Sequence, residues 1–599
     1  MKLLIAVLIL TTAALPPAVA CAAAPAHRNG YIQLVRDGDV WWFQDAAGEK
    51  FFSLGVNCVG GCFGHCEERP PGEARKGRIV RQLRAMGFNT AGAWSSPSVW
   101  KDFYFVDQIY TGFVESANDV FDESFWAEFE RHLTKEIQPF AGNADFMGYF
   151  LDNERKWDPC AVLQFYLQLH RDAPGSRALM EFLQDLYEGK IKLLNRNWNA
   201  SFRSFEDIAG SSAPKCGSVL LEKLFKPWRN RVAAHYYENY CRLLRRLDPH
   251  HLILGIRYKG IPELPLFQLL APYFDVNSIN HYNRYAQLDA RYSEFYRISG
   301  KPLLITEFSF SGYPHPGHAS QLFIDVYSQE NRSIGYSKYV LSAARAPYMV
   351  GMHWFMWRDY AGNWDYPPDI NVGLVSSDET EIYSQLEGRI KETNNAVNAA
   401  HRTAVTPEQA KRPLGLRLLH RFAAGIDGDL SEWDQRHLFL PQETARLLDG
   451  DDTEQRFYLS WDGNLLFVAG DIADSRMDYP GADSLWQADY LSLYLRPSVG
   501  RKNGTTDYAL FYIHPTGGGA AGNEPRVIEW RVPEGYRPLP SKVSLRPKAG
   551  GYILEAAIPL KFASGKPLHP GMKYQMKLIH QDANGIRRAS RTDLIAVEP

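Results

Sequence analysis

Up to about residue 400, short apolar runs alternate along the chain with amphipathic stretches, and beyond that point only strand-like runs remain. The apolar runs are bounded by Gly, Pro, Asn or Asp and are too short for buried helices, so they predict strands. The amphipathic stretches between them repeat apolar residues at helical spacing. Strands separated by helices favour a mostly parallel sheet in the first part of the chain.

The first part contains eight such strands. The first ends at Asn57, and the others lie in FNTAGAW, FYFVDQI, FMGYFLDNE, LILGIRYKG, VNSINHYN, PLLITEFSF and YMVGMHWFMWRD. An aromatic-rich β-hairpin precedes the first strand, and a mostly helical insert occupies about 162–247. This order predicts an α/β fold, a (β/α)8 TIM barrel over residues 30–400, whose active site lies at the carboxyl ends of the strands.

A change of pattern near residue 400 marks a second unit. Residues 401–415 are rich in Pro and charge and predict a linker. Residues 416–599 consist of short alternating runs separated by Gly, Asp and Pro, which is typical of an all-β sandwich.

The first twenty residues have the layout of a secretory signal peptide, with Lys2, an apolar run and small residues at 18–20. Cys21 follows directly and resembles a bacterial lipoprotein box, so we expect export to the periplasm, to the outer membrane as a lipoprotein, or to the medium. No other stretch is apolar enough to span a bilayer, and membrane attachment would come from a lipid on Cys21 alone.

Charge and composition limit the classes of binding partner that we expect. Lys and Arg number 66 against 68 Asp and Glu, which gives no electrostatic case for nucleic acid. Aromatic residues make up 13% of the chain, and flat amphipathic rings suit sugar faces as well as protein cores.

Six cysteines remain after Cys21. Cys58, Cys62 and Cys66 crowd one loop with His65, a spacing that allows a zinc site. Glycines between them make a helical ligand face unfavourable, and disulfides persist in an oxidising compartment, so we favour disulfides. Cys160 follows the fourth strand and could be bridged to that loop.

Two glutamates close strands of the predicted barrel: Glu154 after the fourth and Glu307 in the seventh. Cleavage of an acetal through an oxocarbenium-like transition state requires one carboxyl to protonate the leaving oxygen and another to stabilise the anomeric carbon. Asn153 stands directly before Glu154 and is placed to hold a sugar hydroxyl. An isolated Asn-Glu pair is a weak signal, and the two opposed strand ends give it weight.

With these motifs in place, residues from about 38 to 400 resemble a clan A glycoside hydrolase, and most resemble the agarase family, glycoside hydrolase family 50. The matching stretches are GYFLDNE with Trp157, ITEFSF, GMHWFMWRD and NVGLV. The resemblance implies a retaining mechanism without a catalytic metal, with Glu154 as acid/base and Glu307 as nucleophile.

Other site positions follow from the resemblance and from strand ends. Tyr282 matches the clan tyrosine that hydrogen-bonds the nucleophile. Trp354 or Trp357 is expected to form the platform under the reacting sugar, and strand alternation allows only one of them. The strand-end candidates for hydroxyl contacts, each with a structural alternative, are Asn57, Trp94 and His281.

One departure from the agarase pattern follows the acid. Agarases usually continue with Leu-Pro, whereas Arg155 and Lys156 stand here. Two cations beside Glu154 could lower its pKa, could face outward toward sulfate or uronate groups, or could be a solvated surface pair.

The region from about 416 to 599 resembles the family 9 carbohydrate-binding modules through IDGDLSEWD and WDGNLLFVAGDI. Trp433 and Trp486 are candidate sugar platforms or buried residues between the sheets. The resemblance allows a structural calcium, to which Asp471 and Asp474 could contribute.

The sequence therefore predicts an exported retaining glycoside hydrolase that cleaves a β-linked, galactose-containing polysaccharide or its oligosaccharides. One alternative keeps the mechanism and changes the substrate, to a β-galactoside or another β-glycan. The other is a surface glycan-binding protein whose barrel has lost catalysis, and retention of both glutamates, Asn153 and Tyr282 argues against it.

Overall fold

The structure is a computed structural model, and it describes the chain in segments. These are residues 30–61, 72–283, 288–312, 324–325, 329–359, 370–405, 416–434, 437–439, 443–444, 456–473, 490–497, 509–514, 526–531, 535–548, 551–559, 573–581 and 587–597. The expected signal peptide, Cys21 and most of the expected linker lie outside the described residues.

A nine-stranded sheet forms the centre of the first unit, and every strand pair in it is parallel. Its strands are β4 (Ser53–Val56), β5 (Thr90–Ala91), β6 (Tyr104–Gln108), β7 (Phe146–Phe150), β8 (Leu252–Ile253), β9 (Tyr258–Lys259), β10 (Asn277–Asn280), β11 (Leu303–Phe308) and β14 (Met349–Trp354). The order is β8-β7-β6-β5-β4-β14-β11-β10-β9. The first strand along the chain, β4, pairs with the last, β14, and the other neighbours in the sheet are successive barrel strands along the chain. This is the order of a TIM-like sheet.

The two ends of this order belong to one stretch of chain. β8 pairs with β7, β9 pairs with β10, and both lie within residues 252–259, the predicted fifth strand. The strand is interrupted at Gly255, where φ is +93° and a Cβ would lie 2.9 Å from the Val276 carbonyl oxygen. Glycine is therefore required at the interruption, and the sheet curls round until its first and last strands share one segment.

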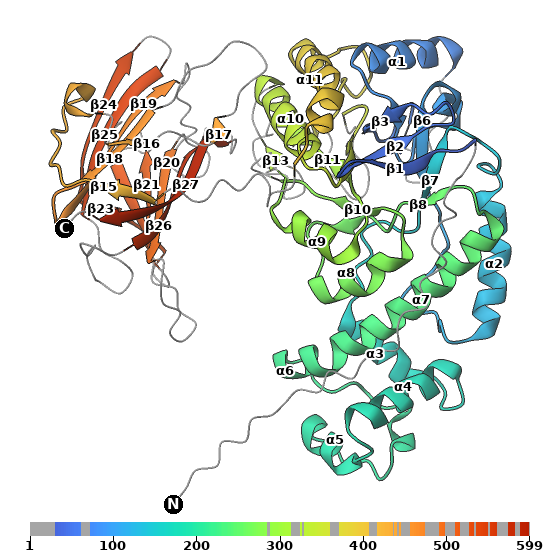
Figure 1. The fold of residues 1–599 in the computed structure, drawn as a ribbon. Coiled ribbons are helices and arrows are strands. Elements are labelled where there is room, and N and C mark those ends of the chain that lie inside the picture. The colour runs from blue at the N-terminus through green and yellow to red at the C-terminus, as the bar shows by residue number, and fades with distance from the viewer. Residues whose placement is uncertain are drawn as a thin grey trace, which may run out of the picture.

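Helices cover the outside of this sheet (Figure 1). They are α1 (Glu73–Ala85), α2 (Glu123–Ile137), α7 (Lys226–Leu247), α8 (Leu264–Leu270), α9 (Arg291–Ser299), α10 (Gln329–Ala344) and α11 (Ser384–Arg402), with 3-10 turns η1 (Pro97–Asp102) and η4 (Ala271–Tyr273).

Helix α2 shows why these segments are helical. The Asp122 carboxylate accepts a hydrogen bond from the Ser124 backbone amide and caps the first turn. Phe129, Leu133 and Ile137 are buried at a spacing of four residues and so share one face of the helix. Burial of each such side chain stabilises the fold by about 1.5–3 kcal/mol.

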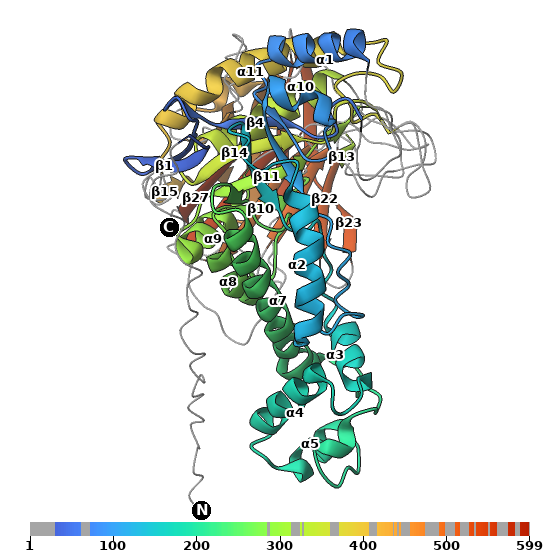
Figure 2. The same ribbon diagram turned by 90° about the vertical axis from the view of Figure 1, so that its right-hand side faces the viewer.

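The predicted insert is helical and lies between β7 and β8. Its elements before α7 are α3 (Pro159–Gln168), α4 (Pro174–Leu186), α5 (Ile191–Trp198), η2 (Glu206–Ile208), α6 (Ser218–Leu220) and the π-helical η3 (Leu221–Phe225). Figures 1 and 2 show α4 and α5 at the amino-terminal end of α7, away from the barrel sheet.

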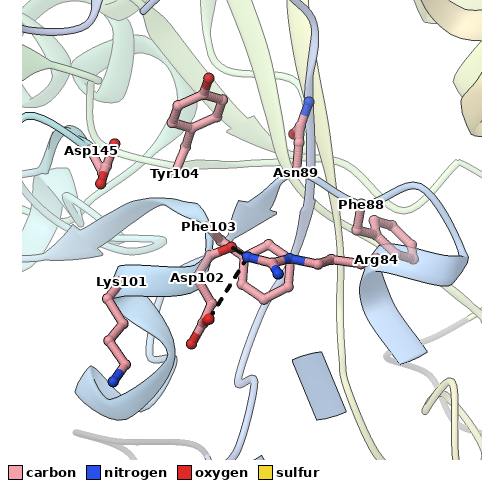
Figure 3. Close-up of a pocket in the computed structure, with 8 residues that line it drawn as sticks. All are labelled: Arg84, Phe88, Asn89, Lys101, Asp102, Phe103, Tyr104 and Asp145. Carbon is pink, nitrogen blue, oxygen red and sulfur yellow. Dashed lines mark hydrogen bonds and ion pairs between the residues drawn. The ribbon is translucent and has the colours of Figure 1, made fainter. Parts of the chain in front are cut away.

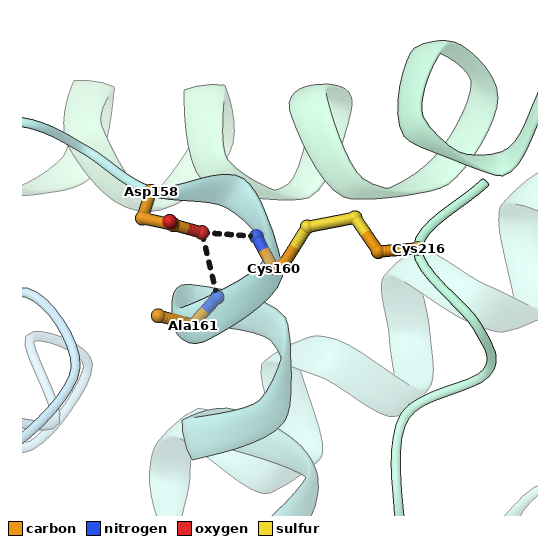
Figure 4. The surroundings of a disulfide bond; sticks show 4 residues. All are labelled: Asp158, Cys160, Ala161 and Cys216. Atoms are coloured by element: carbon orange, nitrogen blue, oxygen red, sulfur yellow. Dashed lines mark hydrogen bonds between the residues drawn. A yellow bond between two sulfur atoms is a disulfide. The ribbon is translucent and has the colours of Figure 1, made fainter. Parts of the chain in front are cut away.

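A disulfide joins Cys160, in the first turn of α3, to Cys216 (Figure 4). The Asp158 carboxylate caps the same turn by accepting from the Cys160 and Ala161 amides. The prediction that Cys160 is bridged to the loop after the first strand is therefore wrong, because its partner lies within the insert. Cys58 is itself disulfide-bonded, which confirms that this loop uses cysteine for cross-linking.

The predicted N-terminal hairpin is part of a three-stranded antiparallel sheet. Its strands are β1 (Gln33–Asp37), β2 (Val40–Gln44) and β3 (Lys50–Phe51). The sheet is attached to the barrel, since the Trp41 amide donates to the Pro347 carbonyl oxygen and the Trp41 indole to Tyr296. A further short pair consists of β12 (Phe310–Ser311) and β13 (Ile324–Asp325).

Beyond residue 416 the described elements are strands and one short 3-10 turn. They are β15 (Leu416–Leu419), η5 (Leu430–Glu432), β16 (Leu438–Phe439), β17 (Glu443–Thr444), β18 (Arg456–Trp461), β19 (Leu465–Ala473), β20 (Tyr490–Pro497), β21 (Ala509–His514), β22 (Arg526–Arg531), β23 (Gly535–Leu539), β24 (Lys542–Lys548), β25 (Gly551–Pro559), β26 (Lys573–Gln581) and β27 (Arg587–Val597). They form an eight-stranded and a five-stranded sheet, largely antiparallel, whose buried side chains share one hydrophobic cluster. That the two sheets form a β-sandwich remains a prediction, which this arrangement supports.

Candidate active site

Glu154 and Glu307 both lie at the carboxyl ends of barrel strands. Glu307 is within β11, and Glu154 follows the end of β7 by a few residues. The Glu154 amide donates to the Arg257 carbonyl oxygen over 3.1 Å, and the His281 amide donates to the Glu307 carbonyl oxygen over 2.9 Å. Backbone bonds to neighbouring strands thus fix both residues at the end of the sheet where TIM barrels carry active sites.

A chain of side-chain hydrogen bonds connects the two carboxylates. The Asn280 Nδ2 donates to Glu154 Oε1 over 3.1 Å and to Asn153 Oδ1 over 2.9 Å. Arg257 Nε also donates to Asn153 Oδ1, over 2.8 Å, and Arg257 Nη2 donates to Glu307 Oε1 over 2.5 Å. Because the Asn153 oxygen already accepts two bonds, its amide nitrogen is the group left to contact a ligand.

Glu307 is buried between a phenol and a guanidinium. The Tyr282 hydroxyl donates to its Oε2 over 2.7 Å, and Arg257 occupies its Oε1. Burial raises the pKa of Glu307, the Arg257 charge lowers it, and the nearby Glu154 raises it again. Burial and the Glu307 charge hold the pKa of Tyr282 well above its ordinary value, so the phenol keeps the proton that it donates.

Glu154 has a more open environment. Its side chain is 25% exposed, against 8% for Glu307. Lys259 Nζ lies 3.5 Å from its Oε2 and is itself largely solvent-exposed. The backbone of Glu154 is left-handed, with φ of +50°. The two carboxyl groups thus differ in burial and in partners, which is the arrangement that gives an acid and an ionised nucleophile at one pH.

Arg257 is the functional residue that the sequence analysis did not identify. Its side chain is fully buried, and its guanidinium lies 4.3 Å from the Trp94 ring centroid and 5.0 Å from that of Phe150. Its backbone has φ of +50°, just after the interruption at Gly255. The available signal was the motif LILGIRYKG, which puts a cation at the end of a strand that leads into the site.

Three predicted hydroxyl contacts have structural roles in this structure. Trp94 is 3% exposed and stacks on Arg257. Asn57 is fully buried and donates to the Thr306 carbonyl oxygen over 2.9 Å, so its amide joins the first strand to the seventh. His281 is hydrogen-bonded through Nδ1 to Tyr292 over 2.6 Å, and burial lowers the pKa of its imidazole to about 4. For Asn57 and Trp94 burial contradicts a direct sugar contact.

The predicted tryptophan platform is also corrected. Trp354 and Trp357 are both fully buried, and their indoles donate to the Val372 carbonyl oxygen and to Glu379. A ring without exposed surface has no face to offer a sugar. The partly exposed aromatic residue of this segment is Phe355, whose ring meets Trp94 edge-on at 6.1 Å.

No single one of the three predicted placements describes both Arg155 and Lys156, the two cations after Glu154. Arg155 is paired with Asp152 and Glu115 and faces away from the Glu154 carboxylate. Lys156 is exposed. The cation that does approach Glu154 is Lys259, from the end of the fifth strand.

The described residues contain no group of three or more His, Cys, Asp or Glu side chains placed to hold a metal ion. In the C-terminal unit, Asp471 is ion-paired with Lys548, and Asp474 and Trp486 lie outside the described residues. Trp433 is 6% exposed and donates to Glu555 over 2.9 Å, so the buried alternative holds for it.

A pocket of about 330 Å³ lies at the opposite end of the barrel (Figure 3). Asn89, Phe103 and Asp145, which directly precede β5, β6 and β7, line it. Arg84 lies over Phe103 and donates to the Asp102 carbonyl oxygen over 2.8 Å. The pocket is thus formed by the amino ends of the strands and is separate from the two glutamates.

No family model matches the chain. It is 26% identical over 415 residues to "Beta-agarase B" of Vibrio sp. (strain JT0107), covering 62% of this chain and 42% of that protein. It is 26% identical over 355 residues to "Beta-agarase A" of the same strain, covering 53% and 35%. The chain thus spans less than half the length of the curated relatives it matches.

Two solved structures share the fold. One is an agarase, AgWH50C, with a TM-score of 0.53 and 18% identity over 62% of this chain and 65% of that one. The other is an exo-beta-agarase, with a TM-score of 0.53 and 19% identity over 63% and 66%. No helix among the described residues is long and apolar enough to cross a membrane. The chain is therefore related in sequence to beta-agarases and has a TIM-like domain similar in fold to those of solved agarases.

Proposed function

We propose that the protein is a retaining, agarase-like glycoside hydrolase that cleaves β-linked galactose-containing polysaccharide by double displacement. Two independent facts support the proposal: the sequence relation to beta-agarases, and a pair of glutamates at the carboxyl ends of opposed barrel strands.

The first step forms a glycosyl ester. Glu307 attacks the anomeric carbon while Glu154 gives its proton to the glycosidic oxygen, which leaves as an alcohol. In the second step Glu154 takes a proton from water, the water oxygen attacks the anomeric carbon, and Glu307 is released as a carboxylate. The anomeric configuration is inverted twice and so retained.

The observation that carries the proposal is the asymmetry between the carboxyl groups. Glu307 accepts from Tyr282 and Arg257, two donors that stabilise its anionic form. Glu154 accepts from the neutral Asn280 and remains accessible, as a group that exchanges protons with substrate and water must. These differences support Glu307 as the nucleophile and Glu154 as the acid/base.

For the substrate, the partly exposed ring of Phe355 is the candidate apolar face, since its backbone amide donates over 3.0 Å to the carbonyl oxygen of Phe308, the residue after Glu307. The Asn153 amide nitrogen is the candidate donor for a sugar hydroxyl. The signal-peptide pattern supports export, which a polymeric substrate requires. Glycan binding by the C-terminal unit, its calcium and lipid attachment at Cys21 remain proposals that rest on the sequence.

The test is to incubate the full-length mature protein with agarose, sulfated galactans, β-galactosides and other β-glycans. Released products are followed by mass, and the first anomer formed is followed by proton NMR. Release of oligosaccharides from agarose with initial β configuration supports the proposal. Hydrolysis of simple β-galactosides alone selects the alternative substrate, and an initial α product overturns retention.

The Glu307→Gln variant serves as the control in the same assay. It should bind the glycan and release nothing, because the amide cannot form the ester. Binding without turnover in the wild type as well would favour the glycan-binding alternative. Turnover by the variant equal to that of the wild type would remove Glu307 from the mechanism.

A further inference from the structure

The acid/base candidate lies in a segment that follows the end of strand β7. Glu154 and Trp157 both have left-handed backbones, with φ of +50° and +47°. Such a conformation is unfavourable for residues with a side chain and persists only where the surroundings fix it. Besides the bond of the Glu154 amide to the Arg257 carbonyl oxygen, this segment is fixed by side-chain contacts to residues distant in the chain.

Arg155, next to the acid, is the centre of these contacts. Its guanidinium donates to Asp152 Oδ1 through Nε over 2.9 Å and also through Nη2. Its Nη1 donates to the Phe113 carbonyl oxygen and to Glu115 Oε2, each over 2.9 Å. The side chain is 16% exposed and its cation lies 4.8 Å from the Phe113 ring centroid. Three planar donors are thus used at once, which a lysine cannot reproduce.

The same contacts extend to the ends of the segment. Asp152 Oδ2 accepts from the Tyr237 hydroxyl of helix α7 over 2.8 Å. The Trp157 amide donates to Glu115 Oε1 over 3.3 Å, and its indole donates to Tyr237 over 3.3 Å. We call Glu115, Asp152, Arg155 and Tyr237 the clamp. It holds the residues on both sides of Glu154 and attaches them to α7.

The clamp is largely withdrawn from water, and this makes it sensitive to loss of one member. The side chains of Asp152 and Glu115 are 5% and 15% exposed. Removal of Arg155 leaves two carboxylates in poorly solvated positions, and both would move toward solvent. The segment that carries Glu154 would move with them.

We propose that Arg155 is a positioning residue for the acid/base: the clamp holds the Glu154 carboxyl at the glycosidic oxygen. The inference rests on the proposed function of Glu154. Arg155 touches neither the substrate nor the reacting atoms, and its effect passes through the backbone of 152–157.

Leaving-group dependence separates this role from a general loss of stability. A misplaced acid slows departure of a basic leaving group, whereas a 2,4-dinitrophenolate leaves without protonation. We expect Arg155→Met to lower kcat/KM for phenyl β-galactoside about 100-fold and that for 2,4-dinitrophenyl β-galactoside less than about 5-fold. The parameter kcat/KM is used because it reports the first chemical step alone.

Lys156→Ala is the matched control, since Lys156 is the adjacent cation and is exposed. It should leave both substrates unaffected. Arg155→Lys keeps the charge without the planar fork and should give an intermediate loss. Equal losses on the two substrates in Arg155→Met, or values equal to those of Lys156→Ala, would overturn the proposal.

Hydrogen exchange gives a readout that needs no activity. Peptides spanning 152–157 should exchange faster in Arg155→Met than in wild type or Lys156→Ala. The Trp157 amide loses Glu115 as a fixed acceptor, and movement of the segment weakens the bond of the Glu154 amide to the Arg257 carbonyl oxygen. Unchanged exchange overturns the clamp even if the enzyme is active. Faster exchange in a protein that cleaves no glycan would support the clamp and contradict the proposed function alone. If Arg155→Met does not fold, Tyr237→Phe removes two hydrogen bonds, the one to Asp152 and the one from the Trp157 indole. It leaves the Arg155 contacts in place and should change both readouts in the same direction by less.

Discussion

The two ends of the barrel each bury a carboxylate against a basic side chain and a tyrosine, with opposite effects on its pKa. At the carboxyl ends, Glu307 meets Arg257 and Tyr282. At the amino ends, Asp248, just before β8, meets His251 over 2.6 Å and the Tyr149 hydroxyl over 2.7 Å. The side chains of Glu307 and Asp248 are 8% and 6% exposed.

The pKa values of these two groups move in opposite directions. Burial raises the pKa of Glu307, and its two donors do not offset that effect. Burial also raises the pKa of Asp248, but bonds from His251, Tyr149 and the His250 amide outweigh it and hold the pKa well below its usual range. The two groups differ in their neighbours. The nearby Glu154 adds to the rise in the pKa of Glu307, whereas the hydrogen bond from His251 is the largest contribution that lowers the pKa of Asp248. A carboxyl group perturbed by burial and by a second carboxyl group is typical of functional sites.

Among the variants, Glu307→Gln should show the largest difference between the two carboxylates. We expect kcat on agarose to fall at least about 10⁴-fold, because the nucleophile is lost. The unfolding temperature should stay the same or rise. The pKa of Glu307 is raised because burial of its charge costs more than the bonds from Arg257 and Tyr282 return, so a neutral amide is tolerated even though Arg257 loses a charged acceptor. Agarose hydrolysis and thermal unfolding by circular dichroism measure the two effects, and a marked loss of stability would contradict the contrast.

Asp248→Asn should act in the reverse way. Loss of the charge removes the ionised acceptor that His251, the Tyr149 hydroxyl and the His250 amide share, and the free energy of unfolding should fall by about 3 kcal/mol. The kcat at a temperature well below unfolding should be unchanged, because Asp248 lies at the other end of the strands. Denaturant titration measures the first quantity, and a matching fall in kcat would show that the two ends are coupled.

The tyrosines that donate to the two carboxylates allow a closer comparison, because replacing each by Phe removes only its hydroxyl group. Tyr282→Phe removes a hydrogen bond to an ionised group, worth about 1.5–3 kcal/mol, and should lower kcat by about 10- to 100-fold. The acidic limb of the pH–rate profile of Tyr282→Phe should move to higher pH, because the pKa of Glu307 rises further. Tyr149→Phe removes the equivalent bond to Asp248 and should lower stability instead. Similar kinetic losses in both variants would refute the assignment of roles.

The smallest effect is a difference in the pH dependence of stability. The pKa of Asp248 is lowered on folding, so its contribution is present above about pH 4 and is lost as the pH falls through the folded value. The pKa of Glu307 is raised on folding, so ionisation costs stability as the pH rises above about 4. The stability advantage of wild type over Asp248→Asn should therefore shrink in acid, and that of Glu307→Gln over wild type should grow toward neutral pH. Urea titrations from pH 3 to 8 measure both stability differences as a function of pH. Differences that do not change with pH would contradict the prediction.

Much of the barrel could be predicted because its strands are buried on both faces. The residues of β7 and β11 are all buried, and continuous apolar runs ending in Glu locate both strand and candidate catalyst in the sequence. Tyr282 could be placed through its resemblance to the clan tyrosine, at the end of the predicted sixth strand VNSINHYN.

The failures concern contacts between segments distant in the chain. Trp354 and Trp357 are buried by contacts with the segment around Val372 and Glu379, which alternation within one strand cannot reveal. Arg257 was missed because its role depends on Glu307 and Asn153, each from another strand. Cys160 was assigned to the wrong loop because its partner lies beyond a helical insert.

The interrupted fifth strand is the part of the barrel that we expect to open first on heating. Between β8 and β9 the Arg257 amide donates to the Ser278 hydroxyl in place of a main-chain oxygen of the sixth strand. Because a side-chain hydroxyl replaces a main-chain acceptor here, we expect this part of the sheet to open before the continuous strands. Such opening would withdraw the Arg257 guanidinium from Glu307. Heat inactivation should therefore be a local and reversible event that precedes the loss of the fold.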